Sequence, residues 1–286
     1  MPQGSILGPL LFLLFINDLP CATNLYVKLF ADDTFLCTQN KCFSSLQNEV
    51  NFELEKVFTW LASNKLTLNL KKSKFMIVTS TNKQNIPDFC IKINNALLEN
   101  CRSYKYLGVV INEKLNWDAH IKHITPKISK ACGALARLRN CISIEVIKNV
   151  YHALIYSYLR YGILIWGNAS QSVLAPLQIL LNKAVRIMVS APFGHIDLNP
   201  AYEFLKILDI GKIFMLETGK FHFKLVNHLL PAQIGNYFDT SANLLVSHDY
   251  NLRSQNSNRP PRFLSNSRDQ PDLSYQIHSS VTKFLS

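Results

Sequence analysis

The seven cysteines of this 286-residue chain are odd in number and form no Cys-x-x-Cys pair. A disulfide framework needs paired cysteines, and a zinc knuckle needs closely spaced ligands, so the sequence excludes both. We therefore predict reduced thiols in an intracellular protein. The cysteines are Cys21, Cys37, Cys42, Cys90, Cys101, Cys132 and Cys141.

A long apolar run is also missing. Leu10–Ile16 is a run of seven apolar residues, well short of the ~18 that a membrane-spanning helix needs. The run has no basic flank and no small-residue cleavage site before Asn17 and Asp18, which argues against a signal peptide. We expect a buried helix here and no membrane partner.

Acidic residues are scarce. The chain has 30 Lys and Arg against 19 Asp and Glu, a formal net charge of +11. Residues 56–87 contain six lysines and no acid, and residues 99–160 carry 10 − 4 = +6. Such an imbalance points to a polyanionic partner, although a charge run can also be a simple solvated face. The 48% apolar and 17% charged fractions are typical of a folded globular protein.

Two adjacent acids, Asp32 and Asp33, stand between two runs of strand-forming residues at 26–30 and 34–37. The alternation in the first run predicts a hairpin with its turn at the acidic pair. Two like charges at this spacing repel by ~1 kcal/mol in water and ~4 kcal/mol at an effective dielectric of 20. A divalent cation such as Mg²⁺ would offset the repulsion, because it prefers carboxylate ligands. The alternative is a solvated Asp-Asp turn.

Further motifs follow one another in order along roughly residues 1–170. They are Pro2-Gln3-Gly4-Ser5 with Gly8-Pro9, Phe30-Ala31-Asp32-Asp33, Leu68-Asn69-Leu70-Lys71-Lys72-Ser73, Tyr106-Leu107-Gly108-Val109, Trp117-x-x-His120-Ile121, and Tyr161-Gly162 with Trp166-Gly167. As an ordered set they resemble the reverse transcriptase of non-LTR (LINE-type, jockey/CR1-like) retrotransposons. Beyond residue 170 the resemblance thins out.

The resemblance implies RNA-directed DNA synthesis with two Mg²⁺ ions, in which Asp32 and Asp33 are catalytic residues and metal ligands. It implies that Gln3 and Gly4 contact the nucleotide and the template base, although Gly4 could also be a simple turn glycine. Lys72 matches a lysine near the triphosphate, a role that suits a mobile point charge. The implied partners are an RNA template, a DNA primer or RNA–DNA duplex, and a dNTP. The implied location is the nucleus and cytoplasm, as a retrotransposon ribonucleoprotein.

Members of this family carry fingers, the first palm strands and a strand with another catalytic aspartate before the Pro-Gln-Gly-Ser motif. Here only Met1 precedes that motif. We therefore expect a C-terminal palm and thumb fragment that is inactive alone, and an endonuclease domain could be missing as well. The rival interpretation is a basic nucleic-acid-binding remnant without catalysis.

The predicted fold class is α+β. We expect a partial antiparallel palm at 1–115, a helical thumb at 116–170, a helical C-terminal region at 171–240 and a polar, flexible tail at 241–286. In the palm, Ser44-x-x-Gln47 predicts a capping box at the start of an amphipathic helix. Strands are expected at 65–70, 75–78 and 103–112, with a hairpin at 89–98.

From Trp117 onward, an apolar stripe predicts a long helix that Pro126 kinks or restarts. His120 and His123 have helical spacing but no further ligands nearby, so a metal site is not expected. Basic residues lie largely off the stripe, where they could contact phosphates without reading sequence. The alternative is a soluble basic helix. The candidate backbone contacts are Lys122, Lys127, Lys130, Arg137 and Arg139.

Overall fold

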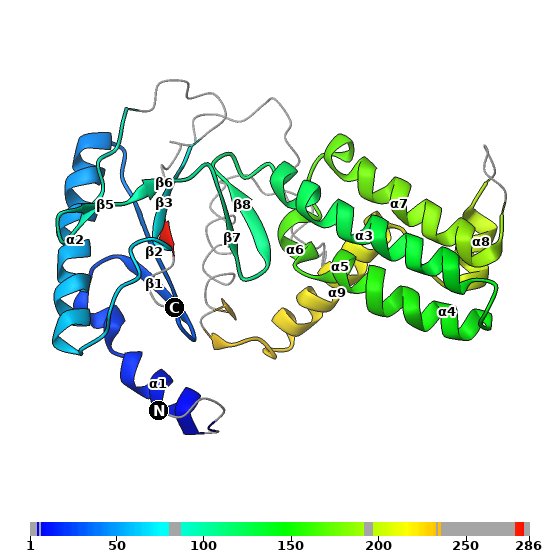
Figure 1. Ribbon diagram of the computed structural model, residues 1–286, viewed down its shortest axis with the longest axis horizontal. Helices are drawn as coiled ribbons and strands as arrows, with labels where there is room; N and C mark the ends of the chain where they lie inside the picture. The colour runs from blue at the N-terminus through cyan, green and yellow to red at the C-terminus, as the bar shows by residue number, and fades with distance from the viewer. Residues whose placement is uncertain are drawn as a thin grey trace, which may run out of the picture. The chain divides into compact units, whose positions relative to one another are not determined.

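The computed structural model describes residues 5, 7–79, 87–191, 197–232, 234–235 and 278–282, the last five by their backbone alone. The chain forms two compact units. Unit 1 consists of Met1–His120 with Asp272–Ser286, and unit 2 is Ile121–Pro271. Unit 1 combines helices with short strands, and the described part of unit 2 is helical (Figure 1). The mixture is that of an α+β chain, as the sequence predicts.

The described residues of unit 1 form three small sheets. The largest has the order β1-β2-β9-β3-β6, while β4 pairs with β5 and β7 pairs with β8. The elements are α1 Leu7–Ile16, η1 Leu19–Ala22, β1 Tyr26–Phe30, β2 Asp33–Gln39, α2 Phe43–Ser63, β3 Lys74–Val78, β4 Lys92–Ile93, β5 Ala96–Leu97, β6 Glu99–Asn100, β7 Ser103–Tyr106, β8 Val109–Asn112 and β9 His278–Thr282.

Helix α2 and the large sheet share one hydrophobic core. The predicted stripe of α2 is confirmed, because all five of its apolar residues are buried. They join Leu36 of β2 and Phe75 of β3 in a single cluster. Full burial of each side chain stabilises the fold by roughly 1.5–3 kcal/mol. The stripe consists of Leu46, Val50, Leu54, Val57 and Leu61.

The connection from β2 through α2 to β3 leaves space for a strand. β2 and β3 do not pair with each other, and each pairs antiparallel with β9. The two strands are therefore parallel, with β9 between them. The sequence did not predict a strand at His278–Thr282, and the rest of the predicted tail lies outside the described residues.

The predicted start of α2 is wrong. The N-cap is Cys42 rather than Ser44, and it makes no side-chain capping hydrogen bond. The Ser44 hydroxyl lies 3.1 Å from the Cys42 Sγ, so it is engaged locally instead of capping the helix. Hydrogen bonds from Ser44 and then Ser45 lower the pKa of the exposed Cys42 thiol to about 6.

The predicted strand at 65–70 is also wrong, because its first residues end α2. Lys65 has a φ of 58°, and its N–H donates to the Ala62 carbonyl. The Leu66 N–H donates to the Leu61 carbonyl, which gives the paired bonds of a Schellman motif. The chain then continues without regular structure, while Leu66 and Leu68 still pack against the core. The strand predicted at 75–78 is confirmed as β3.

Residues with positive φ angles set the position of the turn in the two remaining hairpins. Asn94 and Asn95 have φ of 45° and 62° and join β4 to β5, which confirms the hairpin predicted at 89–98. Leu107 and Gly108, with φ of 45° and 82°, split the single strand predicted at 103–112 into β7 and β8. Both turns have the paired positive φ of type I′ turns. The prediction of one continuous strand is therefore wrong.

Helix α1 is less buried than the sequence predicts. Ile16 is buried and Phe12 packs against the core, but most large side chains of the helix are exposed by 45–67%. Within the part of the chain that the structure describes, nothing covers this face. The prediction of a buried helix therefore holds only for Ile16 and in part for Phe12. The exposed residues of the run are Leu10, Leu11, Leu13, Leu14 and Phe15.

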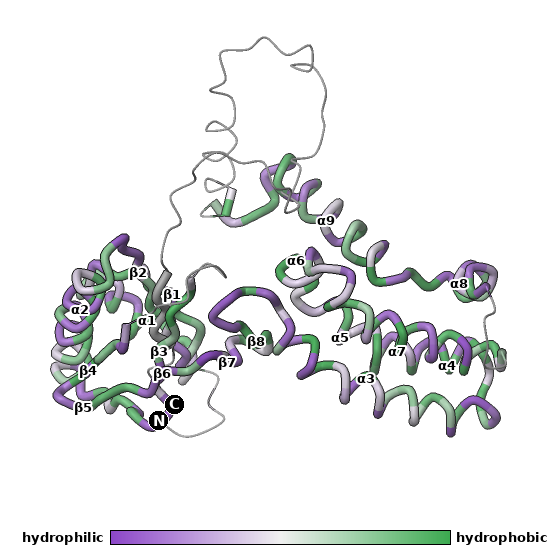
Figure 2. The backbone as a smooth tube through the Cα atoms, turned by 90° about the horizontal axis from the view of Figure 1, so that it is seen from above, coloured by the Kyte–Doolittle hydropathy of each residue, from purple (hydrophilic) through white to green (hydrophobic). Residues whose placement is uncertain are grey.

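The described part of unit 2 is a helical bundle. Pro126 lies inside α3, which continues through it without a restart. Hydrophobic and hydrophilic stretches alternate along the helices, as expected for amphipathic packing (Figure 2). The elements are α3 Asp118–Leu138, which begins in unit 1, α4 Ile144–Tyr151, the π-helical η2 His152–Tyr156, α5 Ser157–Arg160, α6 Ile163–Trp166, α7 Gln171–Val189, α8 Asn199–Leu205 and α9 Ile210–Val226.

Helix α7 is long and apolar enough to cross a membrane by length and composition, the one such helix among the described residues. The sequence analysis did not identify it, because Lys183 and Arg186 interrupt its apolar run. Five of its residues are buried in the structure at helical spacing, as in the core helix of a bundle. They are Leu177, Leu181, Ala184, Val185 and Met188.

Candidate active site

The acidic pair lies at the tip of the β1–β2 hairpin, as predicted, but the turn is shifted by one residue. Phe30 pairs with Asp33, so the turn residues are Ala31 and Asp32 instead of the predicted acidic pair. Ala31 has a φ of 50°, and Asp32 is not among the residues with positive φ. A positive φ at the first turn position alone is the pattern of a type II′ turn. Asp33 is therefore a strand residue, and Asp32 alone occupies the tip.

The two acids differ in environment. Asp32 is exposed, whereas Asp33 is half-buried. Residues opposite each other in an antiparallel pair share a face, so Asp33 lies on the face of Phe30. Thr34 is fully buried and stands on the core face, opposite Leu29. Neighbouring strand residues alternate between faces, so the Asp33 carboxylate is directed away from the core.

Two tyrosines of β7 lie close to Asp33. The ring centroids of Tyr106 and Phe35 are 5.4 Å apart, so β7 covers the face that carries Asp33. Burial, and then the negative charge of Asp33, raises the pKa of Tyr104 and of Tyr106. The acidic site therefore has an aromatic wall whose hydroxyls stay protonated at neutral pH. Sequence reasoning placed neither residue at the acidic site, although Tyr106 belongs to the Tyr106-Leu107-Gly108-Val109 motif and Tyr-Lys-Tyr alternates directly before the Leu107-Gly108 turn.

His120 ties the β7–β8 hairpin to the start of α3. Its side chain is buried, and its Nδ1 accepts a hydrogen bond of 3.3 Å from the Val110 N–H. An accepting Nδ1 leaves the ring proton on Nε2, so the imidazole is neutral. His120 therefore supports the strands that bear the two tyrosines.

The acidic pair fits part of a magnesium site. Carboxylate oxygens are suitable ligands for Mg²⁺, and Asp32 is exposed at a turn where a hydrated ion has access. Within the described ranges, no group of three or more His, Cys, Asp or Glu side chains could hold a metal ion. The two aspartates thus provide some of the required ligands, and further oxygen ligands have to join them.

The predicted nucleotide-binding residues are placed only in part. Lys72 is exposed in the turn before β3, and its N–H donates to the carbonyl and to the Oδ1 of Asn69 at 3.1 and 3.3 Å. Asn69 therefore shapes this lysine turn, a role that sequence reasoning missed. Lys74, by contrast, forms an ion pair of 2.8 Å with Glu99. Gln3 and Gly4 lie outside the described residues.

The five basic residues predicted to contact nucleic acid differ in exposure. Lys122, Lys130 and Arg137 are exposed on α3. At 3.6 residues per turn they fall within about 80° of one another around the helix axis. Lys127 is half-buried, with its Nζ 3.0 Å from His123 Nε2 and 5.5 Å from the centre of the Tyr158 ring. Arg139 is half-buried beyond the end of α3, so three of the five form one exposed basic face.

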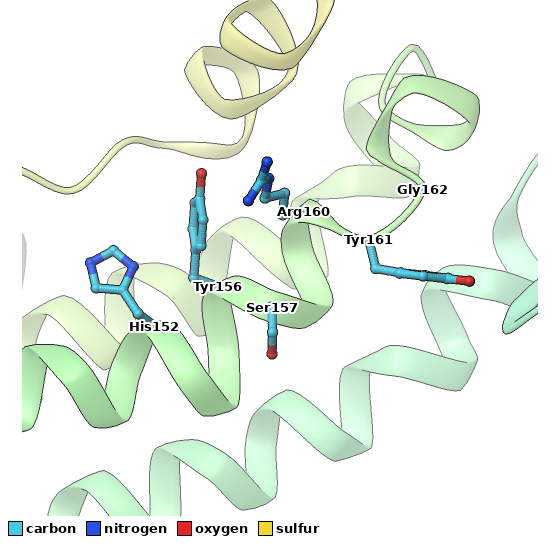
Figure 3. A pocket seen from close by; sticks show the side chains of 6 residues that line it. All are labelled: His152, Tyr156, Ser157, Arg160, Tyr161 and Gly162. Atoms are coloured by element: carbon cyan, nitrogen blue, oxygen red, sulfur yellow. The ribbon is translucent and has the colours of Figure 1, made fainter. Parts of the chain in front are cut away.

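A hollow of about 450 Å³ lies in unit 2, around the π-helical segment. His152, Tyr156, Ser157, Arg160, Tyr161 and Gly162 line it (Figure 3). Arg160 is paired with Glu217 at 3.1 Å, and burial followed by the charge of Lys148 lowers the pKa of His152. The sequence analysis singled out Tyr161-Gly162 as a motif, but it did not predict this hollow.

Comparison with known proteins relates unit 1 to a defined family. Residues 1–111 match the family model described as reverse transcriptase (RNA-dependent DNA polymerase). The RNA-directed DNA polymerase from mobile element jockey of Drosophila melanogaster is 28% identical over 205 residues, 68% of this chain and 22% of the relative. The probable RNA-directed DNA polymerase from transposon BS of the same species is 28% identical over 253 residues, 82% of this chain and 28% of the relative.

A third relative matches over more of the chain. It is the probable RNA-directed DNA polymerase from transposon X-element of Drosophila melanogaster, 24% identical over 281 residues, 96% of this chain. No solved structure matches the chain. Across the three relatives, the chain spans 22–28% of their own length.

Proposed function

Because residues 1–111 match the reverse transcriptase family model, we propose that the chain belongs to the reverse transcriptases of LINE-type retrotransposons and provides the acidic tip of an RNA-directed DNA polymerase. The observation that carries the proposal is the position of Asp32 and Asp33. They lie at an exposed hairpin tip inside the segment that matches the family, and β7 covers one side of them. A protein that only binds nucleic acid gains nothing from two acids beside its phosphate contacts.

The proposed reaction is in-line attack of a primer 3′-hydroxyl on the α-phosphate of a dNTP, with pyrophosphate as the leaving group. Asp32 is the best candidate for a direct ligand of Mg²⁺, and Asp33 for a second ligand. Two bound ions would stabilise charge on the attacking and leaving oxygens. Lys72 would bind the triphosphate, and the tyrosine wall would limit access of water to Asp33.

The partners of this reaction are an RNA template, a DNA primer or RNA–DNA duplex, and a dNTP. A two-ion site needs a carboxylate besides those of the tip, so we propose that the chain alone is inactive. Residues up to 115 act as part of a palm, 116–170 as a thumb and 171–240 as a helical extension. The proposed setting is a retrotransposon ribonucleoprotein in the nucleus and cytoplasm, without a membrane.

A chimera tests the polymerase proposal. The full chain is joined behind the polymerase segment that precedes the matching region in the Drosophila melanogaster jockey protein. We expect Mg²⁺-dependent primer extension on an RNA template by the chimera and only background extension by either part alone. A chimera that folds and binds RNA–DNA duplex but extends no primer would contradict the proposal.

The basic face of α3 gives the second prediction. Affinity for RNA–DNA duplex should fall by about 0.7–0.9 log units per log unit of salt for each neutralised phosphate. Combining Lys122→Gln, Lys130→Gln and Arg137→Gln should reduce that slope by about 2–3, because each residue contacts one phosphate. Fluorescence anisotropy at several salt concentrations measures the slope.

The matched control removes the same charge elsewhere. Lys41, Lys92 and Lys114 are exposed outside α3, and their combined change to Gln should leave the slope nearly unchanged. If both triple variants lower the slope equally, binding reflects only net charge and the assignment of the α3 face is wrong.

A further inference from the structure

The helix around the π-helical turn η2 carries a row of side chains in the hollow of unit 2. His152, Tyr156 and Arg160 lie four residues apart, and Figure 3 shows that all three project from the same side of the helix. Ser157 and Tyr161 point away from this row. π-helical turns are rare inside α-helices and often occur at functional sites. The row therefore places two flat rings and a planar cation together in one hollow.

The two rings of the row are accessible and ordered. His152 is exposed and Tyr156 is half-buried, and their ring centroids are 5.2 Å apart at 77°, an edge-to-face arrangement. The fully buried Tyr151 ring lies 5.1 Å from the His152 ring and 6.5 Å from the Tyr156 ring. Burial, and then the charge of Lys148, keeps the pKa of His152 below its ordinary value, so the imidazole is neutral at pH 7. The row thus offers an uncharged aromatic surface that a buried ring supports.

Arg160 presents its guanidinium at the end of the row. Its Nε donates to Glu217 of α9 at 3.1 Å, and its side chain is 54% exposed. Glu217 is 13% exposed and also pairs with Lys220 at 2.8 Å, so two cations share one carboxylate. This bond uses one of the five N–H donors of a guanidinium. An anionic group in the hollow can therefore contact Arg160 without breaking its ion pair.

Two glycines hold α9 beside Arg160. Gly162 has a φ of 64°, which allows the turn between α5 and α6. A Cβ on Gly167 would lie 2.5 Å from the ring of Phe214 in α9, so a larger residue there would displace α9. Helix α9 in turn brings Glu217 to Arg160. Both glycines belong to the last of the ordered sequence motifs, which therefore shapes the surroundings of the hollow.

We propose that this hollow binds unpaired nucleotides of single-stranded RNA, with a base stacked on the rings of His152 and Tyr156 and a neighbouring phosphate against Arg160. RNA as the ligand rests on the proposed polymerase function. The volume of about 450 Å³ lies within the range of small-ligand pockets. Proteins that bind single strands combine aromatic rings with basic groups, because every base has a face that can stack. Bases of a duplex are already paired and stacked, so a duplex should not use this site.

The charge around the hollow is only slightly positive. Lys148, Arg160 and Lys220 are accompanied by the carboxylates of Glu145 and Glu217, which gives 3 − 2 = +1. Phosphate contacts therefore add little, and stacking carries most of the affinity. The decisive substitutions are those that remove the rings rather than the charges.

The test measures binding of the full chain to a short fluorescein-labelled oligouridylate and, separately, to RNA–DNA duplex. His152→Leu combined with Tyr156→Leu removes both rings and keeps apolar side chains in their place. We expect oligouridylate to bind about tenfold more weakly to this double variant, the effect of roughly one lost base–aromatic stack, and duplex affinity to stay unchanged. The matched control, Phe52→Leu combined with Phe204→Leu, removes two exposed rings away from the hollow and should change neither affinity.

Two outcomes of the binding experiment would overturn the proposal. If the double variant keeps its thermal unfolding and binds oligouridylate as tightly as the control variant, the hollow is not the site. Equal losses for oligouridylate and duplex would overturn the preference for unpaired nucleotides. Primer extension by the chimera tests the polymerase proposal separately, so failure of that proposal is distinguishable from failure of this one.

Photo-cross-linking of the parent chain gives a second test that needs no variant to fold. An oligouridylate that contains iodouridine is irradiated with the full chain, and the cross-linked residue is located by mass spectrometry. We expect the cross-link on His152 or Tyr156, because the halogenated base reacts with an aromatic ring that it contacts. Cross-links found only on residues outside the hollow would overturn the site.

Discussion

Asp32→Asn should lower primer extension by the chimera by about a thousandfold or more, while its affinity for RNA–DNA duplex stays the same. The amide keeps the size of the side chain and a carbonyl oxygen, so the exposed turn should survive. The substitution removes a negatively charged oxygen ligand for a hard cation. Metal stabilisation of transition-state charge is worth several kcal/mol, and each 1.36 kcal/mol changes a rate tenfold.

Three further substitutions test whether the loss of primer extension is specific to Asp32. Asp33→Asn should cost less than Asp32→Asn, because Asp33 is a half-buried strand residue and not the tip of the turn. Lys72→Ala should lower turnover only modestly, because it removes one exposed charge near the triphosphate. Asp88→Asn is the matched control, since it removes an exposed carboxylate away from the hairpin. If Asp32→Asn extends primers as well as Asp88→Asn does, the catalytic assignment is wrong and the solvated-turn interpretation returns.

Glu53→Ala should destabilise unit 1 by about 1–3 kcal/mol, the usual cost of leaving a buried polar group without its hydrogen-bond partner. Glu53 is 3% exposed in the middle of α2. Its carboxylate accepts hydrogen bonds from the Thr23 hydroxyl at 2.8 Å, the Asn24 N–H at 2.7 Å and Lys56 Nζ at 2.7 Å. These bonds anchor the segment just before β1, and their loss leaves the buried Thr23 hydroxyl without its acceptor.

The same carboxylate makes stability depend on pH. Burial acts to raise the pKa of Glu53, but hydrogen bonds from Lys56, Asn24 and Thr23 outweigh it and lower the pKa to about 2. The unfolded chain has a glutamate pKa of about 4.3, so between the two values it binds more protons than the folded chain. Stability from Glu53 is therefore complete above about pH 5 and is lost as the pH falls toward 2.

Urea unfolding at pH 3 and pH 6 measures this contribution. Glu53→Gln should show a smaller difference in unfolding free energy between the two pH values than the parent chain shows. Glu55→Gln is the control, because Glu55 is exposed on the same helix. An equal pH dependence for both variants would mean that Glu53 contributes nothing particular to acid sensitivity.

The elements that could be predicted from the sequence are those determined by residues close together along the chain. The apolar spacing of α2 is set within 21 residues, and all five of its stripe residues are buried. The hairpin around Asp32 was predicted from alternation, yet its turn was displaced, because the positive φ falls on Ala31. A turn defined by one backbone angle is not visible in a hydrophobic pattern.

The elements that the sequence did not reveal depend on distant partners or on competing local structure. Residues 65–70 alternate like a strand, but Lys65 and Leu66 complete the end of α2. β9 has a polar sequence without strand alternation, and its strand partners β2 and β3 lie far away along the chain. The tyrosine wall likewise required knowing that Leu107-Gly108 is a turn that allows β7 to face Phe35.

The distance along the chain between β3 and β9 has a consequence for biosynthesis. From Val78, the last residue of β3, the ribosome adds 278 − 78 = 200 residues to reach His278, the first residue of β9. At about 5–20 residues per second, this takes roughly 10–40 s. Isolated hairpins form in about 1–10 μs. β2 and β3 are therefore synthesised long before β9 is available to pair with them, on the timescale of folding.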